Sequence, residues 1–220
     1  AELEREAESA VQHVVSKQLE AGVDVGNDGE QPRVGFQTYV PRRMSGFGGE
    51  SKRPTPRDMA EFPDFMAVMQ RRNMMRAKVF NAPQAIAAVE YEDLSGVQQE
   101  CALFLSCTDQ QPDKFTERFM TAASPGIIAT TMLNAHYDSH ERYVMAIAEQ
   151  MKKEYEYIHA QGLLLQLDAP DLAMERTFLF QDLSIAEFQK IIETHIEAVN
   201  IATENIPADR IRLHICWGNY

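Results

Sequence analysis

Strand-like and helix-like patterns alternate along this chain, and no other feature narrows its possible folds as much. Short apolar runs are separated by stretches of about 20 residues in which apolar side chains recur at helical spacing. The helical stretches cover 2–22, 97–108, 138–162 and 184–205, and the strand-like runs cover 23–28, 85–93, 163–168 and 210–216. This alternation is typical of βαβ units with a parallel sheet, so we predict an α/β fold.

Composition limits the class of protein further. The chain has 220 residues, of which 45% are hydrophobic, enough for one domain with a sizeable core. Its net charge of -12, with no single basic face, argues against nucleic acid as a partner. We see no signal peptide and no apolar run long enough for a membrane span, so we expect a cytoplasmic protein without a membrane partner. The chain has only three cysteines, and an odd number cannot all pair, which argues against a disulfide framework.

A long glycine- and proline-rich segment interrupts the first half. Residues 33–57 show no sustained periodicity, and long irregular segments in compact domains are often functional. Its glycines lack the spacing of a phosphate-binding loop. We therefore predict an irregular active-site loop over 33–57.

Polar residues stand where successive predicted strands end. They are Asp28 and Glu30, Glu90 and Glu92, Asp168, and finally His214 and Cys216. In a (β/α)8 barrel the carboxyl ends of the strands converge on one mouth, where the active site lies. A doubly wound open sheet would also place polar residues there, but no dinucleotide-type glycine fingerprint follows any strand. We therefore favour a TIM barrel.

The last strand-like run suggests a metal site. Side chains at i and i+2 of a strand point to the same side, so His214 and Cys216 share a face. Imidazole nitrogen and thiolate sulfur are ligands that suit zinc. A core histidine beside a buried cysteine would give the same letters, so both interpretations stand at this point.

Four stretches, in the same order and spacing, resemble the cobalamin-independent methionine synthase family of zinc-dependent thiol alkyltransferases. The last is similar to the family's zinc-binding strand, and the others to its Gly-Glu motif, its T-G-P-V-T-I segment and its Q-I-D-E-P-A-L strand. In this chain they read "RLHICWGNY" (212–220), "AGVDVGNDGE" (21–30), "FMTAASPGII" (119–128) and "YIHAQGLLLQLDAPDLAM" (157–174).

The resemblance implies a fold, a cofactor and roles for four residues. It implies a (β/α)8 barrel and methyl or alkyl transfer to a thiol that Zn²⁺ activates, as in methionine synthesis from homocysteine. Matched residue by residue, His214 and Cys216 correspond to zinc ligands. Glu30 corresponds to the glutamate that binds the substrate ammonium group, and Asp168 to the catalytic aspartate near the bound thiol. The partners implied are a small-molecule thiol and an alkyl donor.

The match departs from the family in several places. The family's remaining zinc ligands lie on later strands, so we interpret 1–220 as one catalytic barrel domain truncated at both ends, with about strands two to six. The rest of the barrel would come from a further segment or a second chain, a homo-oligomer included, and the piece alone should be inactive. "LDAP" replaces the usual D-E-P, and we see no second barrel, which favours the single-barrel branch and leaves the use of folate open.

Other functions remain open at this level. A coenzyme M-type alkyltransferase would need cations for a sulfonate, and Arg42, Arg43, Lys52 and Arg53 are candidates. A metal-free enzyme resembling uroporphyrinogen decarboxylase would have the same fold without zinc. A third alternative is a non-catalytic binding module.

Overall fold

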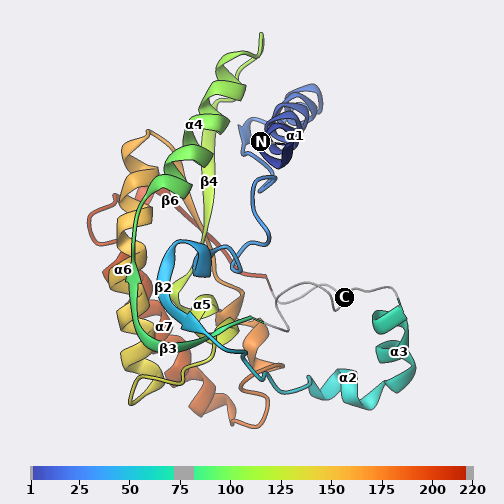
Figure 1. Cartoon of the computed structure of the whole chain (residues 1–220), viewed down its shortest axis with the longest axis vertical. Helices are drawn as coiled ribbons and strands as arrows, with labels where there is room; N and C mark the ends of the chain where they lie inside the picture. The colour runs from blue at the N-terminus through green and yellow to red at the C-terminus, as the bar shows by residue number, and fades with distance from the viewer. Residues whose placement is uncertain (1, 72–81, 217–220) are drawn as a thin grey trace.

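The computed structural model describes residues 2–71 and 82–216 and contains a parallel four-stranded sheet (Figure 1). The strand order is β1-β4-β5-β6, so strands consecutive in this series are neighbours in space. The strands are β1 (Val25–Gly26), β4 (Glu117–Ala123), β5 (Leu164–Asp168) and β6 (Ile211–His214). Because all four run in parallel, their carboxyl ends meet at one edge. The predicted α/β class with a parallel sheet is confirmed.

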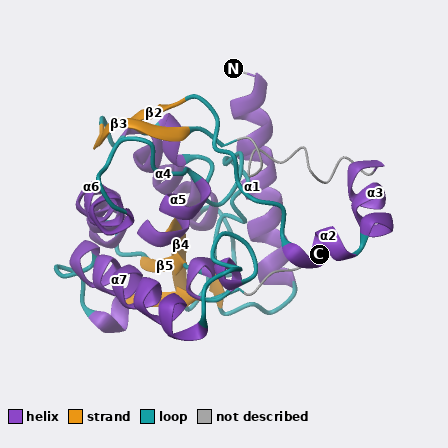
Figure 2. Cartoon of the chain, turned by 90° about the horizontal axis from the view of Figure 1, so that it is seen from below, coloured by secondary structure: helices purple, strands orange, loops and turns teal. Residues whose placement is uncertain are grey.

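Helices connect these strands, as the sequence predicts. The long ones are α1 (Glu2–Glu20), α4 (Ser95–Asp109), α6 (His140–Ala160) and α7 (Ile185–Ala202). The short ones are α2 (Arg57–Glu61), α3 (Pro63–Arg71) and α5 (Pro125–Thr131), with 3-10 turns η1 (Val40–Arg42), η3 (Pro170–Leu172), η4 (Met174–Arg176) and η5 (Ala208–Arg210). Helices α6 and α7 contact each other and lie on one side of β4 and β5 (Figure 2).

The apolar face of α6 forms much of the core. Its members recur every three or four residues, so they line one side of the helix. All of them are fully buried: Tyr143, Val144, Ile147, Met151, Tyr155 and Ile158. They pack in one cluster with the buried β5 side chains Leu165 and Leu167. The helical pattern in the sequence therefore predicted both the helix and the face that it buries.

The hairpin β2 (Met44–Gly48) and β3 (Gln84–Tyr91) corrects two predictions. β3 pairs antiparallel with β2 in a separate two-stranded sheet, so the run 85–93 is not a barrel strand. Glu90 and Glu92 are consequently exposed and do not lie at the carboxyl edge of the parallel sheet. The segment 33–57 is less irregular than predicted, because it contains β2.

Gly46 explains why the sequence hides β2. It has a φ of +89°, and a Cβ added there would lie 2.5 Å from the carbonyl oxygen of Ala88. Only glycine fits this bulge, where the register shifts between Ser45 and Phe47. A strand that needs glycine inside it carries little of the alternation by which strands are recognised.

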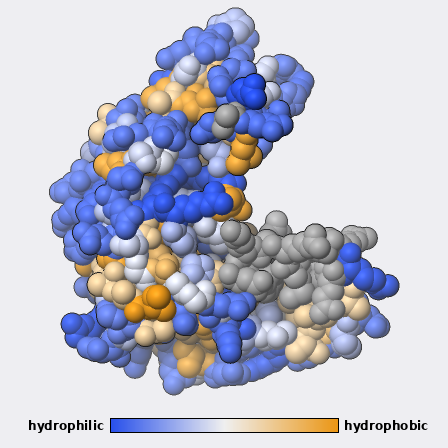
Figure 3. All heavy atoms as spheres, in the orientation of Figure 1, coloured by the Kyte–Doolittle hydropathy of each residue, from blue (hydrophilic) through white to orange (hydrophobic). Residues whose placement is uncertain are grey.

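Two further predictions meet the limits of the described residues. The stretch 64–76 also has a helical sequence pattern, which α3 confirms as far as Arg71, and 72–76 lie outside the described residues. Within the described residues, every helix is too short or too polar to cross a bilayer. The molecule is hollowed on the right of Figure 3, between the part that carries α1 and the part that carries α2 and α3.

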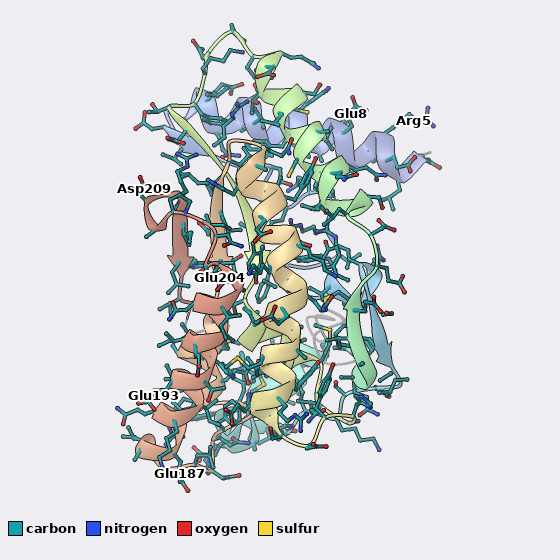
Figure 4. The ribbon with its side chains drawn as sticks, turned by 90° about the vertical axis from the view of Figure 1, so that its left-hand side faces the viewer. Arg5, Glu8, Glu187, Glu193, Glu204 and Asp209 are labelled. Atoms are coloured by element: carbon teal, nitrogen blue, oxygen red, sulfur yellow. The ribbon has the colours of Figure 1, made fainter. Side chains whose placement is uncertain are left out.

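The outer surface around α7 is acidic. Glu187, Glu193, Glu204 and Asp209 lie along α7 and the turns that follow it, and all four are exposed (Figure 4). They are distant in sequence from Glu30 and lie on the helical exterior, so they belong to the solvated face.

Candidate active site

Asp168 and His214 lie side by side at the carboxyl edge of the sheet. They end the neighbouring strands β5 and β6 and are partners in the parallel register. His214 Nδ1 is 3.0 Å from Asp168 Oδ1, and Gln166 Nε2 donates to the same oxygen at 3.0 Å. The Asp168 side chain is 9% exposed and that of His214 is 56% exposed. The carboxylate is therefore held at the rim of the sheet, with the imidazole reaching into solvent.

Cys216 follows two residues later, beyond the end of β6. Its side chain is partly buried. The donor chemistry of the pair fits zinc, because Asp168 engages Nδ1 of His214 and leaves Nε2 to face a metal. A ligating histidine usually has its other nitrogen oriented by a carboxylate in this way. Among residues 2–71 and 82–216, no cluster of three or more metal-binding side chains is present, so these two donors would need further ligands.

Glu30 is presented by a tight turn after β1. It is a non-glycine residue with a φ of +56°, a left-handed conformation that costs energy. The side chain of Asp28 stabilises the turn, since its Oδ1 accepts from the backbone N–H of Glu30 at 3.0 Å. Asp28 is buried, and its other oxygen has no hydrogen-bond partner within the described part of the chain.

The surroundings of Glu30 favour a cation. Burial raises the pKa of its carboxyl, and the nearby carboxylates of Asp168 and Asp28 raise it further, although a hydrogen bond with Thr121 and the charge of Arg33 oppose them. Burial likewise raises the pKa of Asp28. A positively charged ligand beside these acids would favour their ionised forms. The arrangement therefore suits an ammonium group.

Arg33 joins the Glu30 turn to the sheet. Its Nη1 donates to the carbonyl oxygen of Thr121 on β4 at 2.9 Å and to Thr121 Oγ1 at 3.2 Å. Its Nη2 forms an ion pair with Glu100 of α4 at 2.8 Å. Both side chains of this pair are buried, so the arginine is fixed by charge-assisted hydrogen bonds.

A second arginine extends this network across the fold. Arg43 pairs with Glu100 at 2.5 Å and with Glu154 of α6 at 2.9 Å, and Tyr39 and Tyr91 also donate to Glu154. Burial raises the pKa of Glu154, but Arg43 and Arg33 outweigh it, so the net shift is downward. The carboxylate is therefore ionised and fully paired in the interior.

The cations proposed for a sulfonate are largely committed elsewhere. Arg43 belongs to the network just described, and Arg53 pairs with the buried Glu175 at 2.6 Å. Both arginines already form ion pairs with buried carboxylates, which weakens the coenzyme M alternative. The other two cysteines, Cys101 and Cys107, are buried on α4.

Sequence inspection missed a buried polar cluster behind Asp168. It consists of Ser124, Asp171, His195 and His140, which come from four different segments. His195 lies on the apolar face of α7, so from the sequence alone it is expected to be an ordinary core residue. No local pattern signals that Asp171 is its partner, 24 positions away.

No protein-family model matches the chain. Two curated relatives match nearly all of it. A methionine synthase of Pyrococcus furiosus is 23% identical over 208 residues, which cover 94% of this chain and 50% of the relative. A methionine synthase of Saccharolobus solfataricus is 24% identical over 221 residues, which cover 100% of this chain and 54% of the relative. The chain thus spans about half the length of the curated relatives it matches.

Solved structures show the same fold. A B12-independent methionine synthase from Shewanella sp. W3-18-1, in complex with selenomethionine, gives a TM-score of 0.69 at 19% identity, covering 96% of this chain and 52% of that chain. A putative vitamin-B12-independent methionine synthase from Listeria monocytogenes gives 0.63 at 18% identity, covering 97% and 55%. These matches confirm the predicted barrel-type fold, of which this chain covers about half. The curated relatives support the family resemblance drawn from the motifs.

Proposed function

Because the chain is related to the cobalamin-independent methionine synthases, we propose that the polypeptide carrying it transfers a methyl group to the thiol of homocysteine. The observation that carries the proposal is the meeting of Asp168, His214 and Glu30 at the carboxyl edge of one parallel sheet. Active sites of barrel enzymes are built at this edge. The motif match and the geometry therefore support the same location.

Each residue has a role that follows from its chemistry. We assign Glu30 and Asp168 to the substrate ammonium group, since the charge of Asp168 acts on the carboxyl of Glu30 and a cation near both would favour their ionised forms. His214 and Cys216 would hold Zn²⁺ together with ligands from outside the described residues. When bound, Zn²⁺ supplies a deprotonated substrate thiol near neutral pH, and the thiolate is the nucleophile. Asp168 also fixes the ring of His214 by its hydrogen bond to Nδ1.

Zinc retention tests the ligand assignment. In the intact polypeptide, Cys216→Ser should abolish tight zinc binding and methyl transfer to homocysteine while preserving the far-UV circular dichroism spectrum, because a thiolate ligand is replaced by a hydroxyl. Metal is measured by mass spectrometry after gel filtration. Cys107→Ala is the matched control, since Cys107 is buried on α4, and it should keep its zinc.

The outcomes separate the alternatives. Wild-type zinc occupancy in the Cys216→Ser protein contradicts the ligand assignment. An intact wild-type polypeptide without zinc supports a decarboxylase-like enzyme of the same fold instead. A zinc protein that methylates coenzyme M but not homocysteine supports the alkyltransferase alternative. A protein that binds the thiol without any turnover supports a binding module.

A further inference from the structure

The missed cluster is a continuous chain of hydrogen bonds. Ser124 Oγ donates to Asp171 Oδ1 at 2.7 Å, and the other carboxylate oxygen, Oδ2, is 2.8 Å from His195 Nδ1. His195 Nε2 is in turn 2.8 Å from His140 Nε2. An ionised aspartate can only accept, so His195 carries the proton on Nδ1 and its ring orientation is fixed by Asp171.

This chain of hydrogen bonds is built into the fold. Asp171 and His195 have side chains that are each 1% exposed. A Cβ added to Gly126 in the first turn of α5 would lie 2.0 Å from Asp171 Oδ2 and 2.4 Å from His195 Nδ1. The pair therefore requires the bare backbone of α5 against it. The backbone of α5 therefore restricts the positions that the Asp171 and His195 side chains can take.

The outer end of the cluster is a neutral imidazole. Burial lowers the pKa of His140 to about 4, and the adjacent His195 contributes to the same direction. Phe180 lies edge-on to the ring, with the centroids 5.7 Å apart. His140 is thus uncharged under ordinary conditions and acts as a hydrogen-bond partner for His195.

Ser124 connects this cluster to the candidate active site. Its backbone N–H donates to the carbonyl oxygen of Asp168 at 3.0 Å, while its hydroxyl donates to Asp171. Asp168 and Asp171 are only three residues apart, joined through Ala169 and Pro170. One serine therefore holds the chain at Asp168 and again at the next turn. Any displacement of Asp171 is transmitted to Asp168 over a short, proline-containing span.

We propose that Asp171 and His195 are positioning residues that fix the carboxylate of Asp168 for the ammonium group of the thiol substrate. The inference rests on the function proposed above and deepens it. His195 acts through Asp171 and does not touch the substrate. Since Asp168 is assigned to the ammonium group, a displaced carboxylate should lower the affinity for homocysteine, which a rise in KM at unchanged kcat reports.

Steady-state kinetics of the intact zinc-loaded polypeptide test the proposal. His195→Ala should raise KM for homocysteine about tenfold or more, with kcat and the KM of the methyl donor little changed. His195→Asn should restore most of the affinity, because its amide N–H can donate to Asp171 in place of Nδ1. His140→Ala should have a smaller effect, since the bond between Asp171 and His195 remains.

A stability control separates positioning from general loosening. Phe188→Leu removes buried apolar volume from the same helix and leaves the Asp171 and His195 side chains in the sequence, so it should lower the melting temperature while leaving KM unchanged. Should His195→Ala fail to fold, Asp171→Asn is the replacement, because it keeps the volume but removes the carboxylate. It should raise KM for homocysteine in the same manner.

The results distinguish this inference from the proposed function. A wild-type enzyme that binds homocysteine while the folded His195→Ala and Asp171→Asn proteins bind it equally well contradicts only the positioning role. Equal increases of KM in Phe188→Leu and His195→Ala, without rescue by asparagine, contradict it as well. A wild-type enzyme that binds no homocysteine contradicts the proposed function itself.

Discussion

Glu30 shows how one residue can be prepared for a charged ligand before the ligand arrives. Its turn is held in a left-handed conformation by Asp28, and its carboxyl lies close enough to Asp168 and Asp28 for their charges to raise its pKa. This clustering of acids is unfavourable in the free protein and is relieved by a cation. The charge of Arg33 and a hydrogen bond with Thr121 oppose this effect and favour the ionised carboxylate of Glu30.

Replacing this carboxylate should weaken substrate binding. Glu30→Gln keeps the size but removes the charge, and hydrogen bonds to charged groups contribute about 1.5–3 kcal/mol, so KM for homocysteine should rise roughly 10- to 100-fold. The measurement is initial-rate kinetics of the intact polypeptide. Glu90→Gln, an exposed glutamate on β3, is the control and should behave as wild type. An unchanged KM in the Glu30→Gln enzyme would contradict the proposal that Glu30 binds the substrate ammonium group.

The site residues differ in how far the sequence could reveal them. Asp168 and His214 follow from strand ends alone, because parallel strands bring their carboxyl ends together. Arg33 and His195 do not, because their importance lies in partners 67 and 24 positions away. The roles of Glu30, Asp168, His214 and Cys216 stay predictions until the variants are measured.

At the scale of elements, periodicity predicted the long helices and the strands β1, β5 and β6, but it missed β4 and failed at the hairpin. Helix α7 is the clearest case, since Ser184 and Glu187 have the S-x-x-E spacing of a capping box and form one in the structure. The hairpin was hidden because β2 needs Gly46 and because β3 reads as an ordinary sheet strand. Whether a strand is parallel or antiparallel depends on its partner, which no local pattern contains.

The cap of α7 should have a measurable share in stability. Ser184 Oγ accepts from the N–H of Glu187 at 3.3 Å, and Glu187 Oε2 accepts from the N–H of Ser184 at 2.8 Å. Ser184→Ala should lower the free energy of unfolding by about 1 kcal/mol, measured by urea denaturation. The control is Ser106→Ala in the exposed interior of α4, which should be neutral or slightly stabilising. Equal stability of both variants would contradict the capping role.

For the whole molecule, buried ionisable groups link stability to pH. His140 has a folded pKa of about 4, below the ordinary 6.5, because burial disfavours its charged form. Between these values the unfolded chain binds a proton that the folded chain does not. The contribution of neutral His140 to the free energy of unfolding is therefore complete above pH 6.5 and is lost as the pH falls towards 4.

A substitution isolates that contribution. His140→Gln removes the titrating group, so the fall in urea midpoint between about pH 7 and about pH 5 should be smaller than in wild type. The readout is a series of urea titrations of both proteins at matched ionic strength. Parallel pH profiles for the two proteins would show that His140 titrates normally in the folded state.

The buried network of Arg33, Arg43 and Glu154 also bears on the order in which the protein can take shape during synthesis. Glu154 becomes available only when α6 leaves the ribosome, 111 positions after Arg43. Until then the nascent segment has two arginines and one internal glutamate, Glu100, to balance them. Enclosing an unbalanced guanidinium is costly, so we expect the side chain of Arg43 to be enclosed only after α6 has emerged.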